Sequence, residues 1–164
     1  MCLYVDTNKH LANNSFVPKI AETDILVYKL LCLCSNEEFI TPYQGYPISF
    51  EKGKFVYPKT EIGKINCEFF TIDEGIHSYF SKSAIEHILD IRYSHIDSKN
   101  LIVFENENEI VYNKYDSIHY AIIPKGSKYF IGIDGDIVSN NLIVFENEIV
   151  YNKYESTHKV TIIE

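Results

Sequence analysis

A nearly identical segment occurs twice in the C-terminal half of this chain. Asn100–Glu107 returns as Asn141–Glu148, and Ile110–Tyr115 returns as Ile149–Tyr154. The first copy holds one extra Asn-Glu dipeptide between its two apolar runs. Two added residues leave every later side chain of a strand on its original face, whereas they would rotate a helix by about 200°. The repeat therefore favours β-strands on both sides of a variable tip.

Each copy is predicted to form one β-hairpin. We expect Leu101–Phe104 to pair with Ile110–Tyr115, and Leu142–Phe145 to pair with Ile149–Tyr154 across a tighter loop. The intervening Glu-Asn-Glu suits a turn because asparagine tolerates left-handed backbone. Copies this similar indicate an added piece of sheet or an extra binding surface, rather than two unique catalytic residues.

Elsewhere the pattern is that of short strands and one helix. Asp24–Cys34 is a long apolar run with β-branched residues, which predicts a buried strand. Ser83-Ala-Ile-Glu86 has the pattern of a capping box, and apolar residues follow at helical spacing. The chain is thus predicted to be an α+β protein, mainly antiparallel β-sheet, with one main helix over about 83–93 and a duplicated C-terminal β-hairpin.

The length of 164 residues suits a single domain spanning 1–164. Within it we expect an N-terminal arm over 1–22, a core over 23–99, and the repeated hairpin segments over 100–123 and 141–163.

Charge and cysteine usage restrict the function. The formal net charge is −8, and Arg92 is the sole arginine, which argues against binding a nucleic-acid backbone. No apolar stretch is long enough to cross a membrane, and the start lacks the pattern of a signal peptide. The four cysteines, at 2, 32, 34 and 67, are expected to be buried reduced thiols rather than a metal site. We therefore expect a cytoplasmic protein with no metal and no cofactor.

Four segments carry a resemblance to known sequences. Asp24–Leu30, Gly75–Tyr79, Ala121–Phe130 and Gly135–Val144, taken in order, resemble small uncharacterised proteins of gut bacteria and their phages. The resemblance covers roughly residues 20–145 and carries no established activity. It implies a phage accessory role in the bacterial host cytoplasm, such as counter-defence by sequestering a nucleotide-like signal or a host protein.

A fainter likeness points to ADP-ribosyltransferase-like folds. Gly75–Tyr79 followed by Ser83-Ala84 is similar to their strand-then-helix segment. The likeness implies that Lys29 or Tyr28 would hold the cofactor. It also implies that Glu105-Asn-Glu107 or Glu146-Asn-Glu148 would supply the carboxylate. An NAD-using enzyme is therefore one alternative, and a structural module whose hairpin edges pair in a homo-oligomer is another.

The leading interpretation is a non-enzymatic binding protein without catalytic residues. Its expected ligand contacts are Tyr43 and Tyr46 in a proline-rich loop, His77 and Tyr79 on one strand, and Lys125 in a turn. Tyrosines can stack on a base, a strand histidine can donate to a ligand, and a lysine in a Pro-Lys-Gly-Ser turn can meet a phosphate. Core packing of the tyrosines, a structural histidine and a plain turn are the alternatives at these positions.

Overall fold

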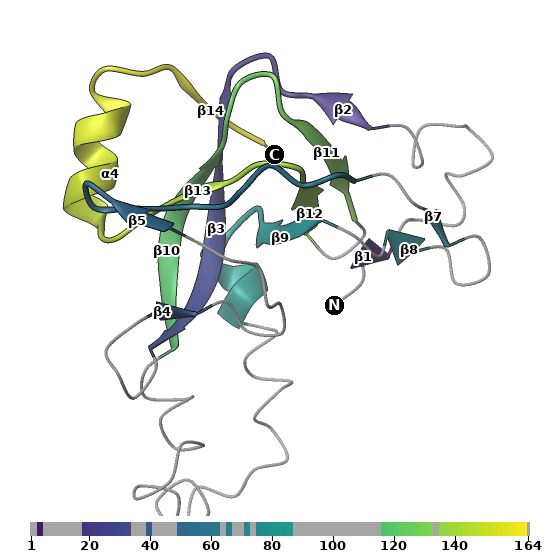
Figure 1. Ribbon diagram of the computed structural model, residues 1–164, viewed down its shortest axis with the longest axis horizontal. Helices are drawn as coiled ribbons and strands as arrows, with labels where there is room; N and C mark the ends of the chain where they lie inside the picture. The colour runs from purple at the N-terminus through teal and green to yellow at the C-terminus, as the bar shows by residue number, and fades with distance from the viewer. Residues whose placement is uncertain are drawn as a thin grey trace, which may run out of the picture.

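The computed structural model describes residues 3–4, 18–33, 39–40, 49–62, 65–66, 71–72, 75–86, 116–132 and 135–163. In this part of the chain a large, curved sheet carries helix α4 on one side, and a second, small sheet lies apart from α4 (Figure 1). The strands are β1 (Leu3–Tyr4), β2 (Lys19–Ile20), β3 (Asp24–Leu33), β4 (Phe39–Ile40), β5 (Ser49–Glu51), β6 (Lys54–Val56), β7 (Ile65–Asn66), β8 (Thr71–Ile72), β9 (Ile76–Tyr79), β10 (Asp116–Ile123), β11 (Lys128–Ile131), β12 (Asp136–Ser139), β13 (Ile143–Phe145) and β14 (Val160–Ile162).

Strand β3 is the centre of the large sheet, whose order is β2-β11-β12-β9-β3-β10-β13-β6-β5. One edge of β3 pairs with β10 in antiparallel register from Ile25 to Cys32. The other edge is shared, because β14 pairs with its beginning, β9 with its middle at Tyr28, and β4 with its end. The small sheet has the order β1-β8-β7. The expectation of a mainly antiparallel sheet is confirmed, and β14 is a parallel exception.

Both faces of β3 are covered, which explains why most of its residues are apolar. Alternation along the strand places Ile25, Val27 and Leu31 on what we call the Ile25 face, in a core cluster with residues such as Phe55, Ile76 and Val144. On the opposite, Leu26 face, Leu26 packs in a cluster with Phe145 and Tyr151, while Leu30 packs in another with Tyr79 and Ile85. The predicted buried strand over 24–34 is confirmed as β3 over Asp24–Leu33, and residue 34 lies outside the described residues.

The second predicted hairpin is wrong. Its first strand exists as β13, but the residues expected to form the return strand, Ile149–Tyr154, lie within helix α4 (Glu148–Glu155). The Asn147 side chain caps this helix by accepting a hydrogen bond from the Val150 amide at 3.0 Å. Tyr151 is buried against Phe145, whereas Ile149 is 69% exposed. A capped amphipathic turn packed on the sheet thus outweighs the strand preference of Ile-Val-Tyr.

The dipeptide argument failed because of where the dipeptide falls. In the second copy the corresponding position is the short connection from Phe145 to the cap residue Asn147, outside any regular element. A change of length in this connection leaves the side chains of the strand and of the helix on their original faces. It therefore does not distinguish a hairpin from a strand-helix unit. The first predicted hairpin, over 101–115, lies outside the described residues.

The predicted helix over about 83–93 is found at its beginning. Residues 82–86 are helical, and the remainder of the prediction lies outside the described residues. The cap differs from the predicted capping box at Ser83. The Ala84 amide donates to Ser81 Oγ at 3.2 Å, so Ser81 takes the capping position and the helix starts at Lys82. Ile85 is buried on the Leu26 face with Tyr79 and Leu30.

Candidate functional site

The residues predicted to bind a ligand do not form one site among the described residues. Tyr43 and Tyr46 lie outside the described residues. His77 and Tyr79 share one face of β9 and are 4% and 5% exposed, with Tyr79 packed in the core. Lys125 is exposed in the turn between β10 and β11, where its backbone amide donates to Asp24 Oδ1 at 2.9 Å. His77, Tyr79 and Lys125 remain a prediction as ligand contacts.

An open pocket of about 860 Å³ lies elsewhere, at the beginning of β3. Such a volume is within the range of small-molecule sites. Its walls come from β2 and the link to β3, from β11, and from β14 with its neighbours. The lining residues are Lys19, Ile20, Glu22, Thr23, Ile25, Tyr129, Lys159, Thr161 and Ile163. His77, Tyr79 and Lys125 are not among them.

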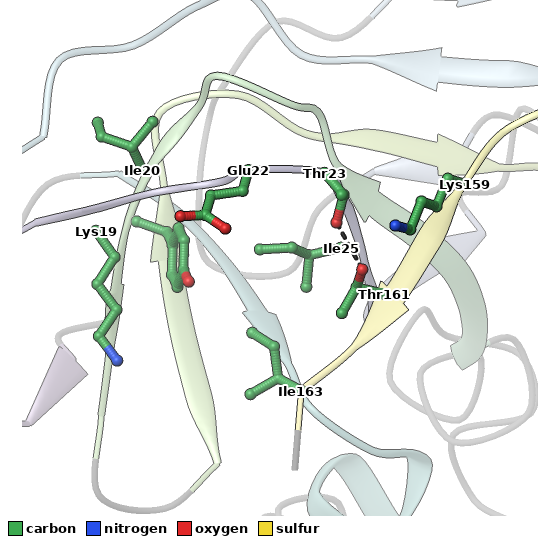
Figure 2. Close-up of a pocket in the computed structure, with 9 residues that line it drawn as sticks. Lys19, Ile20, Glu22, Thr23, Ile25, Lys159, Thr161 and Ile163 are labelled. Carbon is green, nitrogen blue, oxygen red and sulfur yellow. Dashed lines mark hydrogen bonds between the residues drawn. The ribbon is translucent and has the colours of Figure 1, made fainter.

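The floor of this pocket is apolar and its β14 wall is polar. Figure 2 shows Ile25 and Ile163 near the centre, and Thr23, Thr161 and Lys159 to their right. Ile25 is 4% exposed and belongs to the core, so the floor is rigidly supported. The parallel register pairs Thr161 with Ile25, which places the threonine on the same face. The hydroxyls of Thr23 and Thr161 are 2.6 Å apart, and the Lys159 side chain reaches toward Thr161.

The opposite wall carries charges of both signs and an aromatic ring. Lys19 and Glu22 are exposed there, and Figure 2 shows the Lys19 ammonium turned away from Glu22. Tyr129 pairs with Lys19 across β11 and β2. Partial burial and the nearby Glu22 carboxylate raise the pKa of Tyr129, so its phenol stays protonated and can donate a hydrogen bond at neutral pH.

A second cluster of polar groups lies inside the protein, on the Ile25 face. Lys29 is 5% exposed, and its ammonium donates to the His77 carbonyl at 2.6 Å. The same nitrogen is 5.7 Å from the ring centroid of Tyr57. Desolvation by burial lowers the pKa of Lys29 from 10.5 to about 7. This side chain is therefore close to its point of half-protonation at neutral pH.

His119 is the cross-strand neighbour of Lys29 on β10. Its Nδ1 lies 2.9 Å from the Phe145 carbonyl, and its Nε2 lies 2.6 Å from Ser117 Oγ. Burial lowers the pKa of His119, and hydrogen bonds with the backbone of Phe145 and Glu146 act in the opposite direction. Because Lys29 and His119 are at most 6% exposed, we assign this pair to the interior and not to a ligand site.

Glu148, one of the carboxylates that an NAD-using enzyme would employ, lies on the opposite face of the sheet from the Lys29 ammonium. Glu148 Oε1 accepts from the Tyr120 hydroxyl at 3.4 Å, on the Leu26 face, while the Lys29 ammonium donates to His77 on the Ile25 face. Tyr28 is the cross-strand neighbour of Tyr120 and shares the face of Glu148. Glu105 and Glu107 lie outside the described residues. ADP-ribosyl transfer thus stays a prediction from sequence.

The pocket was not predicted from sequence, and no local pattern marks it. Thr23 and Thr161 are 138 positions apart and meet only because β14 adds to β3 in parallel. Within the described ranges, no helix has the length and apolarity needed to cross a membrane. Those same ranges contain no cluster of three or more His, Cys, Asp or Glu suited to a metal ion. The chain matches no protein-family model, no curated protein and no solved structure.

Proposed function

We propose that the protein is a non-enzymatic binding protein that holds a small, nucleotide-like anion in the pocket between β2, β11 and β14. The observation that carries the proposal is the combination of Lys159 and Thr161 with an apolar floor in a pocket of about 860 Å³. An ammonium beside a hydroxyl can bind a phosphate through charge-assisted hydrogen bonds. The isoleucine floor and the Tyr129 ring can cover a sugar and a base.

The resemblance to proteins of gut bacteria and their phages supplies the biological setting for this proposal. In that setting the protein acts in the bacterial host cytoplasm as an accessory protein and lowers the free concentration of a nucleotide-like signal. A pocket that binds without converting its ligand suits sequestration, because a stoichiometric complex is enough to withdraw a scarce signal from its receptor.

Calorimetry against nucleotides and ADP-ribose derivatives tests the proposal. We expect binding by the native protein and a loss of affinity of about tenfold or more for Lys159→Glu, since the substitution replaces an attractive charge with a repulsive one. Lys59→Glu changes the net charge equally at an exposed residue that does not line the pocket, and it should bind as the native protein does.

Lys125→Glu distinguishes the pocket from the site predicted from sequence. If this variant loses binding while Lys159→Glu retains it, the ligand binds at the turn between β10 and β11, and the pocket proposal is wrong. The proposal also fails if no compound of the panel binds at millimolar concentration. Of the two binding partners predicted from sequence, only a host protein would then remain.

A homo-oligomerising module stays the third alternative, with strand β5 in place of the predicted hairpin edge. The feature that favours it is Phe50 on strand β5, which ends the order of the large sheet and leaves this side chain 55% exposed. An exposed aromatic residue on an edge strand is a common site of strand pairing between copies. A monomeric mass in light scattering at high protein concentration would argue against it.

A further inference from the structure

The two walls of the pocket differ in chemistry. On the β14 wall, one cation, Lys159, accompanies the hydroxyls of Thr23 and Thr161. On the opposite wall, the Glu22 carboxylate is close enough to raise the pKa of the Tyr129 phenol. Carboxylates only accept hydrogen bonds, and they repel a second anion. A ligand with donors at one end and an anion at the other therefore matches the pocket in one orientation only.

We infer, on the basis of the proposed function, that the pocket selects ligands of the nucleoside monophosphate class and binds them in one direction. The single terminal phosphate lies against Lys159 and Thr161. The sugar and base cover Ile25 and Ile163, and their hydroxyl or amino groups donate to Glu22. A ligand with anionic groups at both ends is disfavoured, because its second anion would meet the Glu22 carboxylate.

The threonine pair can supply a donor to the phosphate. Each hydroxyl has one proton and two acceptor positions. Thr23 Oγ1 lies 3.3 Å from the Asp24 carbonyl and can donate to it, while Thr161 Oγ1 lies 2.6 Å from Thr23 Oγ1. When the Thr23 hydroxyl donates to Thr161 Oγ1 instead of the Asp24 carbonyl, the 2.6 Å hydrogen bond is kept and the Thr161 proton can rotate toward the ligand. Thr161 is exposed and on the pocket face, so this rotation requires no change in the backbone.

Lys19 is the alternative cation, and its position is less suited to this role. It is exposed, and in Figure 2 its ammonium points away from the centre of the pocket. It also stands on the same wall as Glu22, whose charge would oppose a phosphate there. The inference therefore assigns the phosphate to Lys159, and replacement of each lysine in turn is its direct test.

Calorimetry with adenosine 5′-monophosphate, adenosine and adenosine 3′,5′-bisphosphate tests the direction of binding. In the native protein we expect the monophosphate to bind about tenfold more tightly than adenosine. Lys159→Gln should remove this preference and leave the affinity for adenosine unchanged. Lys19→Gln should keep the preference. Glu22→Gln should strengthen binding of the bisphosphate relative to the monophosphate by about threefold, a small factor because Glu22 is exposed.

The outcomes separate this inference from the proposed function. If nucleotides bind but Lys19→Gln, and not Lys159→Gln, removes the preference for the monophosphate, the pocket binds in the reverse direction and only the inference fails. The same holds if Glu22→Gln leaves the ratio of bisphosphate to monophosphate affinity unchanged. Absence of binding by all three compounds overturns the nucleotide form of the proposed function, and the inference with it.

Discussion

Lys29 lies on the buried Ile25 face of β3, between apolar side chains of the same strand. Its neighbours on the Ile25 face, Val27 and Leu31, are fully buried in the core. The charged form of Lys29 has left water and has gained a carbonyl partner at His77, which does not compensate for its full hydration. The lowered pKa of about 7 is the consequence, since the protein interior favours the neutral amine.

The stability of the protein should therefore depend on pH through Lys29. The unfolded chain binds a proton at Lys29 up to about pH 10.5, whereas the folded protein binds it only below about pH 7. Between these values the unfolded state holds more protons, so the free energy of unfolding should rise with pH, by up to about 1.4 kcal/mol per pH unit.

Chemical denaturation at pH 6, 8 and 10 of the native protein and of Lys29→Met checks this expectation. The stability of the methionine variant relative to the native protein should decrease as the pH rises. Surface charges titrate in both proteins, and the comparison cancels them. Parallel pH profiles would show that Lys29 does not bury its ammonium as described.

At the scale of the element, α4 shows why one sequence supports two local structures. Ile149, Val150 and Tyr151 favour strands, yet Val150, Tyr151 and Tyr154 also fall on one face of a helix. The helical conformation is favoured by the Asn147 cap and by the surface of the sheet on which the helix packs. Tyr151 stacks on Tyr120 of β10, with ring centroids 4.7 Å apart. Tyr120 is distant in sequence, so no window along the chain contains this contact.

The cap of α4 has a measurable effect. Asn147→Ala removes the acceptor of the Val150 amide and should lower the free energy of unfolding by about 1 kcal/mol. Asn147→Asp keeps an acceptor and adds a favourable charge at the helix N-terminus, so it should retain or increase stability. Asn152→Ala is the matched control within the helix, where alanine is the better helix former and no loss is expected. Equal losses at 147 and 152 would contradict the helix.

The mainly antiparallel sheet and its central strand could be predicted from the sequence, but helix α4 and the pocket could not. β3 and β9 were predicted because an apolar run and a glycine before a short strand are local signals. Gly75 has φ near +131°, and a Cβ there would come within 2.1 Å of Val138 Cγ1. The pocket depends instead on the parallel pairing of Thr161 with Ile25, and a preference for hairpins does not anticipate that pairing. The likeness to ADP-ribosyltransferase-like folds suggested Lys29 as a residue that holds the cofactor. The burial of Lys29 depends on the neighbouring strands and cannot be judged from the sequence of β3 alone.

At the scale of the whole molecule, Asp24 joins three segments that are distant in sequence. Its Oδ1 accepts from the Lys125 amide, and its Oδ2 accepts from the Tyr154 hydroxyl at 2.5 Å. Its backbone pairs with Val160 of β14. Burial, aided by this hydrogen bond, raises the pKa of Tyr154. One carboxylate thus connects the turn after β10, helix α4 and the strand that forms a pocket wall.

A double-mutant cycle measures this connection. Tyr154→Phe should cost about 1–2 kcal/mol, because it removes a hydrogen bond to a charged acceptor. Asp24→Ala should cost more, because it also leaves the Lys125 amide without its acceptor. The double variant should be less destabilised than the sum of the two, since the lost hydrogen bond is counted in both. Additive losses in urea denaturation would show that the two residues do not interact.

The parallel addition of β14 to β3 also determines when the pocket can come into being. Thr23 leaves the ribosome 138 residues before Thr161, an interval of roughly ten seconds at ordinary rates of translation. A nascent or prematurely terminated chain that stops before residue 159 has one wall and the Ile25 part of the floor, but it lacks Ile163 and the other wall. Such a fragment should leave the ligand in solution, so capture of the ligand would begin only after translation has passed β14.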